Sequence, residues 1–232
     1  MHAPGSQLIP VDLLLRAYRA GVFPMADHRS DPEVYWVEPR ERAIIPMDGF
    51  RLSGSLRKTL RQGRFEVTCD RAFGEVIATC AEPREEHAES WISHRIEASY
   101  LALYRAGHAH SIECWQDGEL AGGLYGVAFD QVFCGESMFS RRTDASKVAL
   151  AWLVAAMRKA GYRLLDCQFM TEHLATLGAV ALPQAGYLGL LSGATGSPDT
   201  TIPAAIRSYS EAASSEASSP GKLIAQSLTQ TS

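Results

Sequence analysis

Residues 110–140 read HSIECWQDGELAGGLYGVAFDQVFCGESMFS, and their pattern predicts a β-rich block. Apolar and polar side chains alternate from His110 to Trp115, which is typical of a half-buried strand. The pair Asp117-Gly118 predicts a tight hairpin turn, and residues 120–133 continue as strands. We therefore expect antiparallel neighbouring strands in this part of the chain.

Helical patterns lie on both sides of this block. Leu150, Leu153, Val154 and Met157 follow the i, i+3, i+4, i+7 spacing of one helix face, which predicts a helix over residues 144–160. A strand over residues 162–170 should follow it. Upstream, the patterns predict helices over residues 8–20, 53–62, 73–80 and 96–106, a strand over 65–68, and a loop with short strands over 22–45.

The composition is that of a folded protein with one large or two small domains. The chain has 232 residues, of which 46% are apolar, enough for a packed core. No signal peptide is expected, and the longest apolar run, residues 148–157, is about half the length of a membrane-spanning helix. The five cysteines form no C-x-x-C pair, so they fit reduced thiols in a cytoplasmic protein.

Charge and polarity are distributed unevenly along the chain. The formal net charge of −4 argues against a general nucleic-acid binder, because non-specific affinity comes from neutralising phosphates. The segment from Arg51 to Arg64 is a local exception, since it holds five cations and no acid. After Arg207 the chain turns to Ser, Ala, Thr, Glu and Gln, which predicts a mobile tail over residues 207–232.

Three short motifs stand out: YRAGVFP at residues 18–24, GESMFS at residues 135–140, and DCQ at residues 166–168. Segments between them, such as GHAHSIE at residues 107–113 and ASK at residues 145–147, occur in the same order as in one known family. Over roughly residues 8–190, the chain resembles the leucyl/phenylalanyl-tRNA–protein transferase family.

The resemblance implies an α+β fold in two domains. A small N-terminal α/β domain would cover residues 1–50. A larger domain similar to the acetyltransferase superfold (GNAT-like), with a mixed and mainly antiparallel sheet, would cover residues 51–206, before the flexible tail at 207–232. The resemblance implies no metal and no cofactor, and His108 and His110 lack a third ligand at zinc-site spacing.

The resemblance also implies an aminoacyltransferase of the cytoplasm, which we expect to be a monomer. Such an enzyme moves Leu or Phe, with Met left open as a third donor, from charged tRNA to the N-terminal Arg or Lys of an acceptor protein. The new peptide bond creates an N-degron, a signal for protein degradation under the N-end rule.

Positioning should dominate catalysis of this reaction. An N-terminal amine has a pKa of about 7.7 to 8.0, so its neutral fraction can attack the activated ester with little help from a base. By the resemblance, the catalytic residues are Asp166, Gln168 and Glu136. Asp166 and Gln168 lie two residues apart on a predicted strand and should share a face.

The resemblance implies that Gln168 acts as a base relayed by Asp166. We expect Gln168 instead to align the nucleophile, because an amide is a very weak base but a good hydrogen-bonding group. Asp166 and Glu136 should attract the cationic N-terminal residue of the acceptor. The plain alternative is a buried Asp-Gln pair that stabilises a sheet edge.

The donor side chain requires an apolar pocket. By the resemblance, the residues that contact it are Leu124, Phe133, Ser137, Met138, Leu150, Leu153, Met157 and Leu165. Trp36 and Trp91 are expected to stack on the terminal adenine of the tRNA. Core packing is the alternative for all these apolar residues, because an apolar stripe at helical spacing is usually core.

Four cations are expected to contact the phosphate backbone of tRNA: Arg57, Lys58, Arg61 and Arg64. On a helix, Arg57, Arg61 and Arg64 share a face. A solvated helix face with no ligand is the ordinary alternative.

Two other functions stay open at this stage. An acyl-CoA N-acetyltransferase would suit the expected fold, although such enzymes hold a pyrophosphate on a glycine-rich turn and residues 140–144 contain no glycine. A non-catalytic binder of charged tRNA or of protein N-termini would use the same residues as the enzyme.

Overall fold

The computed structural model describes residues 8–83, 89–215 and 218–229. Within them, seven strands form one sheet in the order β4-β5-β6-β7-β8-β3-β9. The strands are β3 Glu41–Ile45, β4 Glu66–Cys69, β5 Ala109–Gln116, β6 Glu119–Phe129, β7 Val132–Ser140, β8 Leu164–Gln168 and β9 Val180–Pro183. In this sheet β7 and β8 are parallel and the other neighbours are antiparallel. An α+β fold with a mixed, mainly antiparallel sheet is thereby confirmed.

The strands β5 and β6 form the hairpin that Asp117-Gly118 predicts. Asp117 and Gly118 have φ angles of 54° and 81°, and two positive angles in succession are the signature of a type I′ turn. The strands β5 and β6 pair along their length on either side of this turn. A second two-residue connection, Asp130-Gln131, joins β6 to β7.

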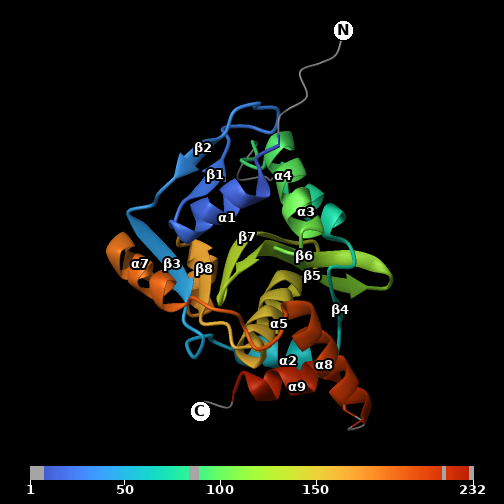
Figure 1. Cartoon of the computed structure of the whole chain (residues 1–232). Helices are drawn as coiled ribbons and strands as arrows, with labels where there is room; N and C mark the ends of the chain where they lie inside the picture. The colour runs from blue at the N-terminus through green and yellow to red at the C-terminus, as the bar shows by residue number, and fades with distance from the viewer. Residues whose placement is uncertain (1–7, 84–88, 216–217, 230–232) are drawn as a thin grey trace.

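Helices cover both faces of the sheet (Figure 1). On one side lie α1 Val11–Arg19, α3 Phe73–Cys80 and α4 His94–Arg105; on the other lie α2 Gly54–Gln62, α5 Ala145–Ala160, α8 Ile202–Ser215 and α9 Pro220–Ser227. Each side has its own cluster of buried apolar residues. The short α6 Glu172–Thr176 follows β8, and α7 Gln184–Gly193 follows β9. Among the described residues, no helix has the length and apolar character needed to cross a membrane.

The N-terminal segment divides between two sheets. β1 Phe23–Met25 and β2 Tyr35–Val37 form a separate two-stranded antiparallel sheet. In contrast, β3 lies within the large sheet, between β8 and β9. A domain boundary at residue 50 would therefore assign to the N-terminal unit a strand that is part of the larger sheet.

The prediction of a mobile tail after residue 207 is wrong for the residues that the structure describes. Helix α8 continues to Ser215, and its buried residues Ile202, Ala205, Ile206, Tyr209 and Ala213 recur every three or four positions. Helix α9 buries Ile224 and Ala225 against the same core. The polar composition of the segment hid this apolar stripe, because an average over residues ignores their spacing. Residues 216–217 and 230–232 of the expected tail lie outside the described part.

Candidate active site

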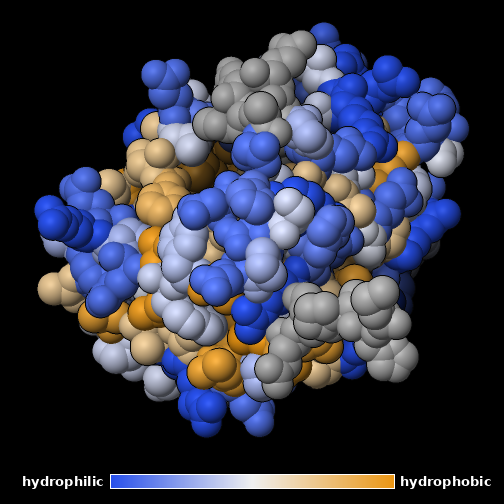
Figure 2. All heavy atoms as spheres, turned by 90° about the horizontal axis from the view of Figure 1, so that it is seen from above, coloured by the Kyte–Doolittle hydropathy of each residue, from blue (hydrophilic) through white to orange (hydrophobic). Residues whose placement is uncertain are grey.

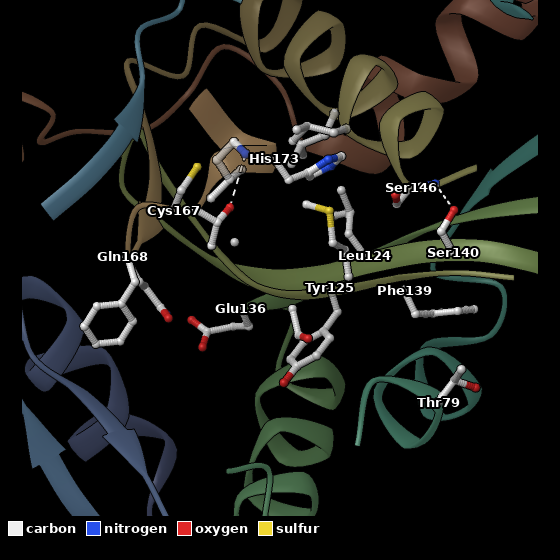
Figure 3. Close-up of a pocket in the computed structure, with 18 of the residues that line it drawn as sticks. Thr79, Leu124, Tyr125, Glu136, Phe139, Ser140, Ser146, Cys167, Gln168 and His173 are labelled. Carbon is white, nitrogen blue, oxygen red and sulfur yellow. Dashed lines mark hydrogen bonds between the residues drawn. The ribbon is translucent and has the colours of Figure 1, made fainter. Parts of the chain in front are cut away.

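A cavity opens where β7 and β8 part. Their parallel pairing ends at Cys134 and Asp166, after which β7 continues along β6 and β8 continues along β3. Between them lies a cavity of about 930 Å³, a typical size for a small-molecule site. Its walls come from β6, β7, β8, α5 and α6 (Figure 3).

Each of these two strands carries an extra residue beside the cavity. On β7, the pairing with β6 skips Glu136. On β8, the pairing with β3 skips Cys167, which stands between Asp166 and Gln168. Such β-bulges redirect side chains and are frequent next to active sites. The two bulges therefore set the directions of the side chains at the strand ends.

Glu136 is a buried carboxyl group held by two tyrosines. The hydroxyl of Tyr18 donates to Oε1 at 2.7 Å, and that of Tyr100 donates to Oε2 at 3.1 Å. Burial raises the pKa of Glu136 to about 7; the polar side chains of Tyr18, Gln168 and Tyr100 oppose the rise, and nearby Asp166 adds to it. Glu136 lines the cavity, so the charge of the cavity wall changes near neutral pH.

Gln168 has an unusual backbone. Its φ of +62° is in the left-handed region, which costs a non-glycine residue about 1–2 kcal/mol. The backbone N–H of Gln168 donates to Oδ1 of Asp166 at 2.9 Å. In the described residues, the buried side-chain Nε2 has no hydrogen-bond partner. Figure 3 shows the Gln168 and Glu136 side chains pointing toward one another, and the Gln168 side chain is close enough to help lower the pKa of Glu136.

Asp166 is completely buried and forms an ion pair inside the protein. Arg42 donates from Nε to Oδ1 at 2.9 Å and from Nη2 to Oδ2 at 2.6 Å. Tyr187 donates its hydroxyl to Oδ2 at 3.0 Å. Asp166 is not among the residues that line the cavity, whereas Gln168 is. The structure thus separates two side chains that strand spacing predicted on one face, because the bulge at Cys167 interrupts the alternation.

Most of the expected pocket residues do line the cavity. These are Trp91, Leu124, Ser137, Met138, Leu150, Leu153 and Leu165. Phe133 and Met157 do not, since both are completely buried in the core behind it. Helix α5 is buried on almost every side, so its helical spacing could not distinguish pocket from core. Trp36 is 41% exposed on β2 and is also absent from the cavity wall.

The expected tRNA-binding cations lie together on or just after α2. Arg57, Lys58, Arg61 and Arg64 are all exposed. Leu56 and Leu60 on the same helix are buried, so α2 has one apolar and one basic face. This surface is strongly basic in a chain whose net charge is −4.

Five residues at the site were missed in the sequence: Tyr18, Arg42, Tyr100, His173 and Tyr187. Tyr18 begins the YRAGVFP motif, and an arginine directly before the apolar residues 43–45 was a usable signal for Arg42. Tyrosines on apolar helix faces are ordinary core residues, so Tyr100 and Tyr187 carried no local signal. His173 lines the cavity with a buried, unpartnered Nε2 among the described residues, and burial lowers its pKa.

Neither a reactive thiolate nor a metal-binding cluster is found among the groups that the structure describes at the site. Cys167 lines the cavity, but burial raises its pKa, so a thiolate nucleophile is not available near neutral pH. Across the described residues, no cluster of three or more His, Cys, Asp or Glu is suited to a metal ion. His110 bonds through Nδ1 to Oδ2 of Asp70 at 2.7 Å.

Comparison with known proteins gives a consistent result. The sequence model of the family described as leucyl/phenylalanyl-tRNA protein transferase matches residues 44–192, and the model of its N-terminal domain matches residues 8–40. The leucyl/phenylalanyl-tRNA–protein transferase of Novosphingobium aromaticivorans is 55% identical, and the alignment covers 97% of each chain. That of Rhizorhabdus wittichii is 60% identical over 81% of this chain and 76% of its own.

Among solved structures, a conserved protein of unknown function from Staphylococcus epidermidis aligns with 76% of this chain and 66% of its own. The sequence identity is 11% and the TM-score is 0.40, a likeness too low to support any conclusion.

Proposed function

This chain belongs to the leucyl/phenylalanyl-tRNA–protein transferase family, and we propose that it moves leucine or phenylalanine from charged tRNA to the N-terminal Arg or Lys of an acceptor protein. It is an aminoacyl-tRNA–protein transferase, which forms a peptide bond at a protein N-terminus. The main support for the finer proposal is one observation: an apolar cavity ends at Glu136 and Gln168.

The apolar part of the cavity suits the side chain of the donor amino acid. Leu124, Leu150, Leu153 and Leu165 line it from a strand, a helix and a second strand. Burying a leucine or phenylalanine side chain is worth roughly 1.5–3 kcal/mol, and a charged side chain would lose its hydration there. Trp91, which also lines the cavity, supports stacking of the terminal adenine.

Glu136 supports a preference for a cationic acceptor. Its carboxyl group faces the cavity, and in the ionised form it can pair with the side chain of an N-terminal Arg or Lys. Asp166 is already paired with Arg42, so we assign the attraction of the acceptor to Glu136.

Gln168 supports a mechanism based on positioning. The acceptor amine, in its neutral form, attacks the ester carbonyl; a C–N bond forms, the C–O bond to the ribose breaks, and a proton passes from the amine to the ribose oxygen. Gln168 can hold the amine in line by accepting one of the amine N–H groups at its side-chain Oε1, which leaves the nitrogen lone pair free to attack. Such alignment can supply about 7–11 kcal/mol of the barrier reduction, without a strong base.

The remaining expectations stay predictions. They are the acetyltransferase-like architecture of residues 51–206, a separate domain at residues 1–50, action as a monomer in the cytoplasm, and tRNA binding by α2. An acyl-CoA acetyltransferase lacks support, because the β7–α5 connection contains no glycine-rich turn to hold a pyrophosphate.

A transfer assay tests the proposal directly. The protein is incubated with Leu-tRNA and a peptide that begins with Arg, and the peptide mass is measured. A gain of one leucyl residue is expected, and none on a matched peptide whose N-terminus is acetylated, because the attacking amine is blocked. Binding of both substrates without a change in mass would show a non-catalytic adaptor, and acetylation supplied by acetyl-CoA would show the rival enzyme.

A further inference from the structure

We propose that Arg42 is a positioning residue for the transfer: together with Tyr187 it holds Asp166, and Asp166 in turn holds the backbone of Gln168. This inference rests on the proposed function, because it explains how Gln168 is oriented for that reaction. It gives Asp166 a role inside the protein and leaves the acceptor cation to Glu136.

The carboxylate of Asp166 has all its hydrogen-bonding capacity used within the protein. Nε of Arg42 lies 2.9 Å from Oδ1 and 3.1 Å from Oδ2, and Nη2 lies 2.6 Å from Oδ2. Tyr187 and the thiol of Cys134 also donate to Oδ2, at 3.0 and 3.4 Å. Both Arg42 and Asp166 are completely buried. A buried charge that is neutralised in this way exerts little attraction on a substrate outside.

The remaining bond of Asp166 reaches the backbone of Gln168. Oδ1 accepts the N–H of Gln168 at 2.9 Å, the two-residue pattern by which Asp side chains stabilise turns. This contact occurs where the φ of Gln168 is +62°, a conformation that glutamine does not adopt readily. Asp166 therefore compensates the backbone strain that directs the Gln168 amide into the cavity.

Arg42 is itself fixed by two distant parts of the chain. Nη1 donates to the carbonyl oxygen of Gly21 at 3.2 Å. The guanidinium group lies between two aromatic rings, 4.7 Å from the centre of Phe23 and 4.6 Å from that of Tyr187. Gly21 and Phe23 belong to the YRAGVFP motif, so this motif has a structural task at the site. The orientation of Gln168 thus depends on the N-terminal segment, on β3 and on α7.

The decisive variant is Tyr187→Phe, which removes one hydroxyl and keeps the aromatic ring over Arg42. The matched control is Tyr209→Phe on α8, which removes a buried hydroxyl that donates to the carbonyl of Ala155 at 3.4 Å, away from the cavity. We expect Tyr187→Phe to lower kcat roughly tenfold, the usual effect of losing a hydrogen bond to a charged group. The KM for Leu-tRNA should not change, because the cavity wall is intact.

A second measurement is independent of activity. In Tyr187→Phe and in Arg42→Lys, the backbone amide proton of Gln168 should exchange with solvent faster, as measured by NMR. In Tyr209→Phe the exchange rate of this proton should match that of the wild type. Arg42→Lys keeps the positive charge but loses the bidentate hydrogen bonding to Asp166. Its kcat should therefore fall at least as far as that of Tyr187→Phe.

Several outcomes would overturn the inference. A Tyr187→Phe variant with the kcat of Tyr209→Phe, or with unaltered exchange at Gln168, would show that Tyr187 and Arg42 do not position it. A selective rise in KM for acceptors that begin with Arg would show that Asp166 recognises the cation directly. Absence of transfer by the wild type would instead overturn the proposed function, and the exchange measurement would still decide whether Asp166 is held as described.

Discussion

At the scale of single residues, Glu136 is a carboxyl group whose pKa is strongly changed by its surroundings. Desolvation favours its neutral form, and the bonds from Tyr18 and Tyr100 favour the ionised form. The result is a carboxyl group that titrates near the pH of the cell rather than near 4.5. A group in this condition destabilises the fold when ionised, which is a common feature of functional sites.

Replacing Glu136 with Gln should change how the reaction depends on pH. In the wild type, kcat/KM for a peptide that begins with Arg should fall below about pH 7, as Glu136 takes up a proton, and the acceptor amine titrates separately near pH 8. Because both ionised Glu136 and the neutral amine are required, the logarithm of kcat/KM should fall at low pH with a slope of about two per pH unit. In Glu136→Gln the slope should be about one, and the value at pH 8 should be lower roughly tenfold or more. An unchanged profile would mean that Glu136 does not act on the acceptor.

The same substitution should stabilise the fold. Because the pKa of Glu136 is raised in the folded state, the folded protein binds an extra proton, and the free energy of unfolding decreases as pH rises from about 4.5 to about 7. Glu136→Gln removes this loss. The free energy of unfolding of Glu136→Gln, measured by urea unfolding, should equal that of the wild type near pH 4. Above pH 7 it should exceed the wild-type value by up to about 3 kcal/mol. A gain that is independent of pH would contradict the raised pKa.

The cavity and the core can be distinguished on α5 by two truncations. Leu153→Ala enlarges the cavity, so the preference for donor should shift from leucine toward phenylalanine. Met157→Ala lies one turn along the same helix but outside the cavity wall, and it should leave the ratio unchanged. Each variant should lose about 2–5 kcal/mol of stability. Competition between Leu-tRNA and Phe-tRNA gives the ratio of leucine to phenylalanine transferred. An equal shift of this ratio in both variants would show that the pocket extends to Met157.

At the scale of elements, the helices and strands with a clearly periodic hydrophobic pattern were predicted well. The site, however, depends on irregular pairing near the ends of β7 and β8. The helix over residues 73–80 and the hairpin at Asp117-Gly118 are confirmed. The bulges at Glu136 and Cys167 were not predicted, because one inserted residue leaves no mark on a short hydrophobic pattern. β9 and α7 were also missed, and α7 supplies Tyr187.

The basic face of α2 allows a prediction about one element. Replacing Arg57 and Arg61 with Ala should raise the KM for Leu-tRNA and leave kcat nearly unchanged, because the cavity is untouched. The slope of log affinity against log salt should become shallower by about 0.7–0.9 for each arginine removed. The control for charge alone is a double variant at two exposed arginines away from α2: Arg105 at the end of α4 and Arg163 between α5 and β8. An equal change in slope for the control would argue against a specific surface on α2.

At the scale of the whole molecule, the C-terminal helices complete the core around α5. Tyr209 on α8 lies edge-on to Trp152 of α5, and Ile224 on α9 belongs to the same buried cluster. The view in Figure 2, taken from above, shows a largely hydrophilic face with apolar residues between the polar ones, as expected when most apolar surface is covered. Removing these helices would therefore expose the core of the enzyme.

The contact between α9 and α2 is close enough to test with one methyl group. A Cβ at Gly221 would lie 2.1 Å from the carbonyl oxygen of Leu60, so Gly221→Ala must push the two helices apart. We expect a loss of about 1–3 kcal/mol in the free energy of unfolding. Gly193→Ala on α7 is the control: no atom lies within 4 Å of its Cβ, so it should be neutral or gain up to about 1 kcal/mol. Equal stabilities would show that α9 does not pack against α2.

Periodic patterns and turn residues act locally, so most helices and strands and the β5–β6 hairpin could be predicted from the sequence. The contiguous motifs identified the family, and the mixed sheet followed from that resemblance alone. The sequence also brought out Glu136 and Gln168, both on the cavity wall. Only the tertiary structure decided which residues of α5 face the cavity and that the C-terminal segment packs on the core. It also decided that Asp166 pairs with Arg42, a residue 124 positions away in the chain. A local pattern cannot specify such a pairing, because the electrostatic partner of a buried charge is set by how distant segments come together.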